Sequence, residues 1–405
     1  MSDPVASVIV DGAAVAKANL RAYLASQAYE VNPATVAGLD LAARTTLTWR
    51  GVVWGYVPGS TATADGAFVL ADANGRRYIR ADVPALRRSA LINGGFDVWQ
   101  RGTSFSTPAS GSYTADRWRV YCDGTPGTYT VSRQAFTLGQ TDVPGEPTSW
   151  LRWVQSVVTS GATALRLQQP IEDVRRFAGQ TVTVLGRMKC VNTRTITPRL
   201  SQYFGTGGSP SATVDTAGAA WVTVPGPTAI WTYYASVIQV PSLAGKTIGT
   251  NGDSALIFSL GLPLTQVQTL DIAELALIPG ALAATVDWPT PAEELAACRR
   301  YYQLATATSA LGALGTGRAT GTTAADLVVP LIAPMRGAVP TVTSINAVST
   351  LRVSGTALSA LSLAGHSDNA VRLTGTVASG LTAGQALLLE GVSAGDGIAI
   401  AQELL

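Results

Sequence analysis

Charged residues are scarce in this 405-residue sequence: Asp, Glu, Lys and Arg make up 13% of it, against about 25% in an ordinary soluble domain. The net charge is only +2, so we expect no concentrated basic face of the kind that binds nucleic acid. No apolar run reaches the roughly 18 residues that span a bilayer. Residues 5–16 come nearest, but Asp11 interrupts them and no basic segment precedes them. We therefore expect neither membrane insertion nor a signal peptide.

Cysteine and histidine are nearly absent as well. Cys122, Cys190 and Cys298 lie far apart and form no CxxC pair, and His366 is the only histidine. We expect reduced, buried thiols in a protein assembled in the bacterial cytoplasm, without a disulfide framework or a zinc site. His366 lies in a polar turn with no Ser or Cys motif around it. We interpret it as an exposed loop residue and expect no catalytic residues of the triad kind.

Aromatic residues are missing from the last hundred or so positions, because every Phe, Tyr and Trp lies at or before Tyr302. Such a sharp change predicts a domain boundary, and we divide the chain into domains at 1–88, 89–290 and 291–405. The core of the third domain would contain only Leu, Val, Ile and Ala. Because such a core is thin, we expect burial between subunits to stabilise it. Within it, Gly312–Gly321 lacks the GxGxxG spacing and is interpreted as a flexible loop.

The first domain combines helical and strand-like patterns. A strand-like run at Ser7–Val10 precedes a predicted helix at Ala14–Tyr29 with one apolar face. Two strands, a turn and a further strand are then predicted at Leu47–Val53, Ala67–Ala71, Asp72–Gly75 and Arg77–Arg80. One helix and one hairpin are too little for an independent core. We therefore expect a small α+β anchoring domain that its neighbours complete in an assembly.

The second domain is a succession of strands separated by Gly and Pro turns. Strands are predicted at Trp118–Cys122, Thr128–Phe136, Trp150–Val158, Thr181–Lys189, Pro198–Phe204, Thr232–Val240, Ala255–Leu260 and Leu270–Leu277. So many strands without intervening helices predict a β-sandwich of the jelly-roll kind. The fold class is thus mainly β.

The third domain begins with a predicted helix. Thr290 can cap it, Pro291 suits its first position and Glu293 completes a capping box. Its apolar face would comprise Leu295, Cys298 and Tyr302. Strands are predicted beyond it at Val328–Ile332, Thr341–Ile345, Leu351–Val353, Ala370–Val377 and Ala386–Glu390.

Ordered motifs between residues 90 and 345 resemble a known family. They read INGGFDVWQRGTSF at 92–105, YTADRW at 113–118, LRLQQPIED at 165–173, FAGQTVT at 177–183, YFGTGGSP at 203–210, PSLAGKTIG at 241–249, EELAACRRYY at 293–302 and MRGAVPT at 335–341. The order resembles the central jelly-roll domain of phage tail fibres and particle spike proteins. The resemblance implies a fold similar to carbohydrate-binding modules of the galactose-binding-like class. Asp65-Gly66 and Gly75–Arg80 resemble a particle-anchoring domain.

The family has no single ligand site, so the candidates come from sugar chemistry. Sugars stack their apolar faces on aromatic rings while polar side chains bind the hydroxyl groups. Candidate glycan contacts on or beside predicted strands are Trp153, Tyr203, Trp221, Trp231 and Tyr233. Strand alternation places Trp231 and Tyr233 on one face and Tyr234 on the other, but it leaves open which face is inside.

The motif residues themselves are interpreted as structural. We predict Phe96, Trp99 and Trp118 in the core, and buried charge-assisted hydrogen bonds for Asp97, Asp116 and Arg117. A polysaccharide depolymerase would need two carboxylates about 5–9.5 Å apart across a cleft. The adjacent pairs Glu172-Asp173 and Glu293-Glu294 do not suggest this arrangement, so we expect no enzyme. No cofactor is expected; a structural calcium ion would suit the fold, although no EF-hand loop occurs.

Together these features predict a fibre or spike subunit on the surface of a virion or virus-like particle. It would bind host cell-surface polysaccharide, join other particle proteins through its N-terminal domain, and form a homotrimer. Two alternatives stay open: a purely structural base or connector, and a depolymerase. Head or tail position, phage or phage-derived particle such as a gene transfer agent, and the glycan itself also stay open.

Overall fold

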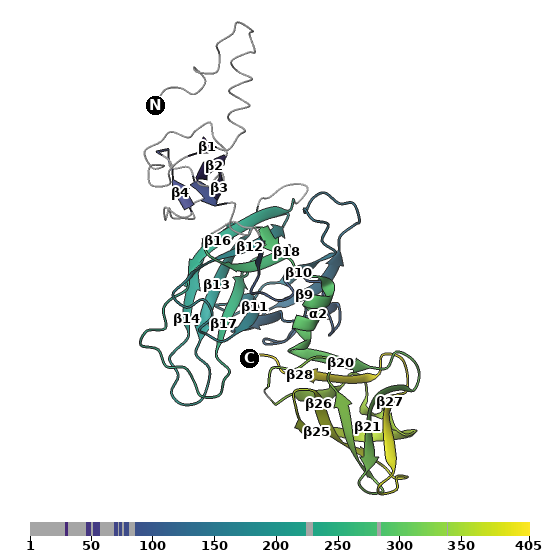
Figure 1. Cartoon of the computed structure of the whole chain (residues 1–405). Helices are drawn as coiled ribbons and strands as arrows, with labels where there is room; N and C mark the ends of the chain where they lie inside the picture. The colour runs from purple at the N-terminus through teal and green to yellow at the C-terminus, as the bar shows by residue number, and fades with distance from the viewer. Residues whose placement is uncertain are drawn as a thin grey trace, which may run out of the picture.

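The computed structural model describes residues 29–30, 46–49, 52–56, 69–71, 73–74, 77–80 and 86–405, apart from 224–229, 282–284 and 338. Its first part is a five-stranded sheet in the order β1-β2-β3-β5-β4 (Figure 1). The strands are β1 Tyr29–Glu30, β2 Thr46–Trp49, β3 Val52–Tyr56, β4 Val69–Ala71 and β5 Arg77–Arg80. The β4–β5 hairpin is confirmed. The expectation of a single hairpin is wrong, because β2 and β3 form a second one.

The predicted strand at Ser7–Val10 lies outside the described residues. So does the predicted helix at Ala14–Tyr29, except for Tyr29, which belongs to β1.

The central part is a β-sandwich of two antiparallel sheets, as predicted (Figure 1). One sheet has the order β16-β12-β18-β10-β9-β7, from Thr232–Gln239, Thr181–Lys189, Gln268–Pro279, Ser149–Val157, Thr128–Ala135 and Ser104–Ser106. The other has the order β14-β13-β17-β11-β8, from Val214–Ala217, Thr195–Tyr203, Ala255–Gly261, Leu165–Glu172 and Arg119–Cys122. A short strand, β15 (Trp221–Val222), also pairs with β13.

Alternating apolar residues build the core between these sheets. Phe96 and Trp118 are fully buried there, and Trp99 packs against its edge. The Phe96 and Trp118 rings lie 5.2 Å apart, and Trp118 meets Phe258 edge-on at 6.0 Å. The predicted core role of these motif aromatics is confirmed. The three cysteines are free and buried, also as predicted.

Strand β11 was not predicted, because Pro170 interrupts its pattern. Pro cannot donate a ladder hydrogen bond and is therefore found where a strand lacks a partner on one side. Here Pro170 pairs with Ile257 of β17, while the ladder to β8 ends at Gln168. The free side is used by Arg117, whose Nη2 donates to the Pro170 carbonyl at 2.6 Å.

Helix α2 (Pro291–Arg299) follows the sandwich. Thr290 caps it and forms the predicted capping box with Glu293. Cys298 is buried on the helix. The prediction that Tyr302 shares its face is wrong, because the helix ends at Arg299 and Tyr302 begins β20. Two short strands that lie far apart in the sequence, β6 (Leu86–Arg88) and β19 (Thr285–Asp287), pair in parallel. Strand β19 directly precedes the helix in the chain.

The last part is a closed six-stranded barrel beside a three-stranded sheet (Figure 1). The barrel order is β21-β22-β26-β25-β24-β27, from Gly312–Ala319, Ala324–Pro330, Ala370–Val377, Thr356–His366, Leu351–Val353 and Ala386–Gly391. The sheet is β20-β28-β23, from Tyr302–Thr306, Gly397–Ala401 and Thr341–Ser344, and a 3-10 turn, η2, covers Val348–Thr350. The core is aliphatic as predicted, with Met335 added to it. His366 is exposed as predicted but ends a strand.

The predicted flexible loop at Gly312–Gly321 is wrong, because most of it is barrel strand β21. Its glycines permit close strand packing rather than flexibility. A Cβ on Gly317 would lie 2.1 Å from the Asp326 carbonyl oxygen, and one on Gly315 would lie 2.5 Å from that of Val328. Pairing of β21 with β22 thus depends on these two glycines.

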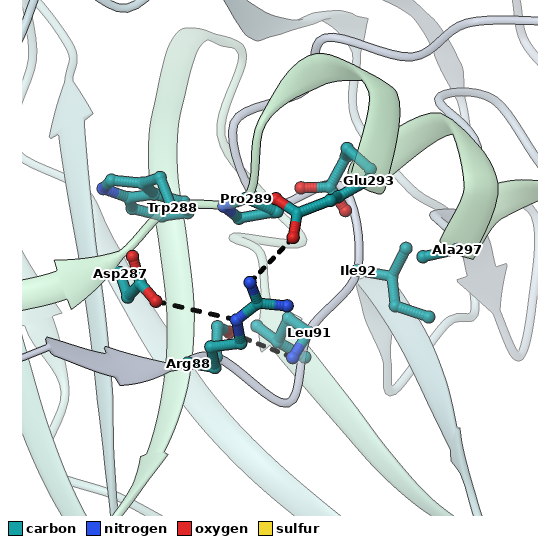
Figure 2. A pocket seen from close by; sticks show the side chains of 10 residues that line it. Arg88, Leu91, Ile92, Asp287, Trp288, Pro289, Glu293 and Ala297 are labelled. Carbon is teal, nitrogen blue, oxygen red and sulfur yellow. Dashed lines mark hydrogen bonds and ion pairs between the residues drawn. The ribbon is translucent and has the colours of Figure 1, made fainter.

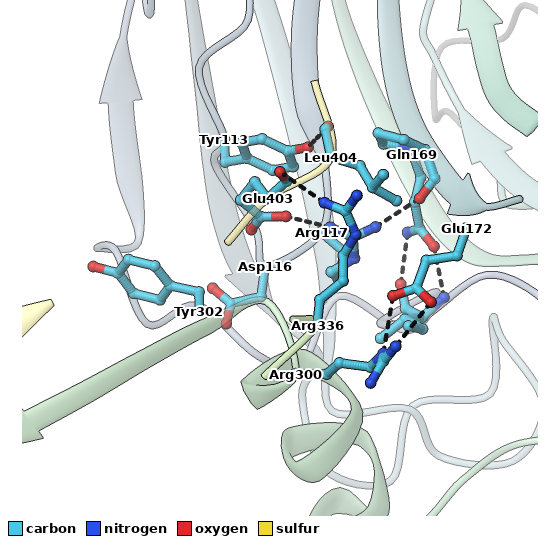
Figure 3. A network of polar contacts seen from close by, with 12 residues as sticks. Tyr113, Asp116, Arg117, Gln169, Glu172, Arg300, Tyr302, Arg336, Glu403 and Leu404 are labelled. Atoms are coloured by element: carbon cyan, nitrogen blue, oxygen red, sulfur yellow. Dashed lines mark hydrogen bonds and ion pairs between the residues drawn. The ribbon is translucent and has the colours of Figure 1, made fainter. Parts of the chain in front are cut away.

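A buried polar network joins the sandwich to the C-terminal part (Figure 3). Glu403 accepts hydrogen bonds from Arg101 Nη2 at 2.7 Å and from Arg117 Nη1. The Arg117 guanidinium lies 3.4 Å above the Tyr301 ring, and that of Arg101 lies 3.6 Å above the Tyr302 ring. The chain end is therefore held against the sandwich by charge-assisted contacts.

Candidate functional site

A groove of about 630 Å³ opens on the outer face of the six-stranded sheet. Its floor is formed by Leu185 and Arg187 of β12, Tyr233 of β16 and Glu274 of β18. Its walls come from three other segments and contain Gly95, Asp97, Pro144, Gly145, Pro147, Val286, Trp288, Pro289 and Glu294. Residues nearly 200 positions apart are thus brought together around one cavity.

An ion pair lies on the groove floor. Arg187 Nε donates to Glu274 Oε2 at 2.6 Å, and the guanidinium carbon lies 5.2 Å from the Tyr233 ring centre. Both charged side chains are about four-fifths buried. Burial raises the pKa of Glu274, although Arg187 opposes this shift. The pair therefore offers both hydrogen-bond donors and acceptors in a place of limited water access.

A β-bulge places Glu274 beside Arg187. Between Leu185 and Arg187 the pairing moves from Ala276 to Ala273, so β18 carries one extra residue there. Glu274 has a φ of +53°, which is uncommon for a residue other than glycine and is seen often at functional sites. Gly94 of the INGG motif supports the bulge: its carbonyl accepts from Leu275 N at 3.0 Å, and a Cβ there would lie 2.0 Å from the Leu275 oxygen.

An aromatic cluster of Phe136, Trp150 and Trp231 lies further along the same outer face. Phe136 is 4.4 Å from Trp150 and 5.5 Å from Trp231, measured between ring centres. The Lys189 amine lies over both tryptophan rings, at 5.7 and 5.2 Å. Lys189 and Arg152 flank the buried Asp271, with Arg152 Nε 2.7 Å from its carboxylate. The cluster thus presents half-buried rings beside a salt-bridged triad.

A smaller pocket of about 130 Å³ adjoins the groove, and the two share Trp288, Pro289 and Glu294. Figure 2 shows Arg88 between the carboxylates of Asp287 and Glu293. Hydrogen bonds from Arg88 and Thr290 lower the pKa of Glu293 to about 2. Glu294, by contrast, is buried and accepts from Asn93 N at 2.5 Å; burial raises its pKa.

Two of the five predicted glycan contacts are wrong, because they lie in the core. Trp153 is fully buried and stacks on Tyr129 at 4.5 Å. Trp221 is 2% exposed, and its Nε1 donates to Ser236 Oγ at 2.7 Å. Both rings are inaccessible to a ligand.

The other three candidates remain predictions, and the structure separates them. Trp231 and Tyr233 lie on the outer face of the six-stranded sheet, Tyr233 being 44% exposed. Tyr234 points the other way and packs on Trp221, as the alternation predicted. Tyr203 lies on β13, in the opposite sheet. A site on this outer face therefore includes Tyr233, which lines the groove, and Trp231, which belongs to the aromatic cluster beside it, but not Tyr203.

The predicted buried bonds of Asp116 and Arg117 are confirmed. Arg117 joins the sandwich to the C-terminal part through Glu403, whereas Asp116 is bonded within the sandwich. Asp116 accepts from Gln100 N at 3.0 Å and pairs with Arg101 at 3.4 Å. Burial opposes the charged form of Arg117, yet Glu403, Tyr113 and other neighbouring groups together outweigh it and the pKa of Arg117 is raised. The prediction for Asp97 is wrong: this residue is exposed and accepts from Ser149 Oγ at 2.8 Å.

The carboxylate pairs do not form a two-acid cleft. Glu172 accepts hydrogen bonds from two nitrogens of Arg300, at 2.9 and 3.0 Å (Figure 3). Its burial raises the pKa, but hydrogen bonds from Arg300 and Tyr301 prevail and lower it. Asp173 pairs with Arg175 instead. Of the second pair, Glu293 binds Arg88 and only Glu294 lines the groove.

Sequence reasoning missed Arg187 and Glu274, although signals for both were present. In β12, Val182, Val184 and Met188 point into the core, so alternation places Arg187 outside. In β18 the core residues are Leu270, Ile272, Leu275 and Leu277. The step of three from Ile272 to Leu275 breaks the two-residue period and marks the bulge that carries Glu274.

Two further expectations concern metals and membranes. Within the described residues, no three His, Cys, Asp or Glu side chains gather as metal ligands would; the suggestion of a structural calcium ion stays a prediction. Likewise, no helix in the described ranges has the length and apolarity of a bilayer span.

No known protein family and no curated protein matches the sequence. Among solved structures, the chain is similar to the enzymatically active domain of tailspike protein 4 of bacteriophage CBA120, with 16% identity and a TM-score of 0.30 over 47% of this chain and 21% of that one. It is also similar to a protein from Bacteroides thetaiotaomicron that is assigned as sugar-binding, with 12% identity and a TM-score of 0.31 over 48% of this chain and 100% of that one. A third is the carbohydrate-binding module TmCBM61 in complex with β-1,4-galactotriose, with 13% identity and a TM-score of 0.27 over 48% and 99%.

This chain thus spans about a fifth of the tailspike domain. At these identities and TM-scores the likenesses carry no conclusion about a site or an activity. The sandwich is established by its own sheet order.

Proposed function

We propose that the chain binds a polysaccharide through the outer face of its six-stranded sheet. The observation that carries this proposal is the groove itself. It combines the exposed Tyr233 ring with the buried Arg187–Glu274 pair in one cavity of about 630 Å³. An aromatic face for the sugar ring and a few fixed polar groups for its hydroxyls are what carbohydrate recognition requires.

Weak single sites would suit such a protein if it is displayed in several copies. A site of ~1 mM affinity provides about 4 kcal/mol. Simultaneous engagement of several sites on one particle raises avidity by roughly 10²–10⁴. The groove need not be deep or highly charged for a particle to attach firmly.

Removal of either aromatic on the outer face tests the site. Tyr233→Ala and Trp231→Ala should each weaken polysaccharide binding at least about 10-fold, because a stacked sugar loses roughly 1.4 kcal/mol or more. Tyr203→Ala is the matched control, since Tyr203 lies in the opposite sheet. Binding is measured on the full chain with an array of bacterial polysaccharides. Equal losses in all three variants, or a loss only in Tyr203→Ala, would contradict the site.

We further propose that the protein is a fibre or spike subunit of a phage or phage-derived particle, attached through its N-terminal domain, and not an enzyme. The ordered motifs at 92–118 and 293–341 support this role. A structural connector would bind no polysaccharide even when clustered on beads. A depolymerase would release reducing ends from a bound polysaccharide, and this release is to be measured in parallel.

The proposed oligomer is a homotrimer. The aromatic-free barrel supports it, because a core of small aliphatic residues gains from burial between subunits. Light scattering at micromolar concentration should give about three times the mass of 41.8 kDa. A monodisperse species of single-chain mass would refute it.

A further inference from the structure

The charges around the groove suggest which polysaccharides it takes. We infer that the groove binds uncharged sugar units and rejects units that carry a carboxylate, such as uronic acids. This inference rests on the proposed function and specifies its ligand class.

Acidic groups outnumber basic groups in the groove lining. Asp97, Glu274 and Glu294 line it, and Arg187 is the only cation among its lining residues. The three acids come from the INGG motif segment, from β18 and from α2. A carboxylate entering the groove would therefore meet a lining in which the acids Asp97 and Glu294 are not balanced by a cation, at a place where partial burial limits screening by water.

Arg187 is already paired with Glu274, which neutralises the charge that would attract an incoming carboxylate. Its Nε donates to Glu274 at 2.6 Å, and its guanidinium lies against the Tyr233 ring. The bulge in β18 holds Glu274 in this position. A bidentate contact with a uronic acid through Nε would require breaking this pair, and one through the two terminal nitrogens would place two carboxylates on a single guanidinium.

The surroundings of the groove do not reverse this balance. In the adjoining pocket Arg88 is shared between Asp287 and Glu293, so one cation faces two carboxylates. On the aromatic cluster, Lys189 and Arg152 flank Asp271 and leave a net charge of +1. That excess charge lies over Trp150 and Trp231, outside the groove lining. Acidic glycans held at this cluster are an outcome that the test must distinguish.

The test compares the same polysaccharide with and without its carboxylates. Bacterial polysaccharides that contain uronic acids are used in native form and after chemical reduction of each carboxyl group to a hydroxymethyl group. The full chain should bind the reduced forms at least about 10-fold more tightly at low salt. At 0.5 M NaCl the preference should shrink, because salt screens repulsion. Equal or tighter binding of the native forms would overturn the inference.

Glu274→Gln tests the cause. It removes one negative charge and leaves the Arg187 charge without its ion-pair partner. The ratio of reduced-form to native-form affinity should therefore fall toward one. Glu390→Gln is the matched control, because it makes the same change on barrel strand β27, and it should keep the wild-type ratio. An unchanged ratio in Glu274→Gln overturns the charge explanation.

The two proposals fail differently. Binding of native forms that is lost on Lys189→Met but kept in Tyr233→Ala places the ligand at the aromatic cluster. Polysaccharide binding by the outer face then stands, while the groove as its site and the inference both fall. If neither form of any polysaccharide binds, the proposed function falls and the inference falls with it.

Discussion

Replacement of Glu403 by alanine is expected to lower the free energy of unfolding by about 3–5 kcal/mol, because it leaves a buried charge without its partner. Arg117 is 1% exposed, and its other polar contact is the Pro170 carbonyl. Arg101, 14% exposed, loses a 2.7 Å contact at the same time. Urea unfolding followed by far-ultraviolet circular dichroism measures the change.

An exposed ion pair provides the control. Arg372 of β26 binds Asp326 of β22 through two nitrogens at 2.7 and 2.8 Å, but the Arg372 side chain is 60% exposed. Such surface pairs contribute about 0–1 kcal/mol, so Arg372→Ala should change stability little. Equal effects of the two substitutions would show that the Glu403 contacts stabilise the chain no more than a surface ion pair does.

Trp153→Ala should also cost about 3–5 kcal/mol, because it empties a large volume of the sandwich core. The ring is fully buried, stacks on Tyr129, and donates from Nε1 to Gln155 at 3.0 Å. Chemical unfolding of the purified variant measures the loss.

Tyr233→Ala is the matched comparison for Trp153→Ala, since it removes an aromatic ring from the opposite face of the same sheet. Tyr233 is 44% exposed, so its loss should change stability by less than about 1 kcal/mol while it weakens polysaccharide binding. A stability loss for Tyr233→Ala as large as that for Trp153→Ala would contradict the assigned faces of the sheet.

The strands that sequence predicted well are those with one face in the core. Strand β12 has the predicted bounds, because Val182, Val184 and Met188 alternate with polar residues. Strands β11 and β21 were missed because Pro170 and the glycines of β21 contradict ordinary strand propensity. In both cases a tertiary contact explains the unusual residues. Pro170 leaves one edge of β11 free for Arg117, and the glycines of β21 allow the close approach of β22.

The candidate site was predictable only in part. The alternation of Trp231, Tyr233 and Tyr234 could be read from the sequence, but the face that turns outward depends on pairing with Arg187 and its neighbours on β12. The groove walls come from Asp97, Trp288 and Glu294. No local pattern shows that these three residues converge, since their meeting depends on the arrangement of the whole sandwich.

The absence of aromatic rings from the barrel has a practical consequence. All nine tryptophans lie before residue 289, so intrinsic fluorescence reports on the sandwich and the N-terminal part while the barrel stays silent. One tryptophan placed at Val328, which is 44% exposed on β22, would give the barrel an optical signal of its own. Opening of the barrel could then be followed separately from that of the domain proposed to hold the sugar.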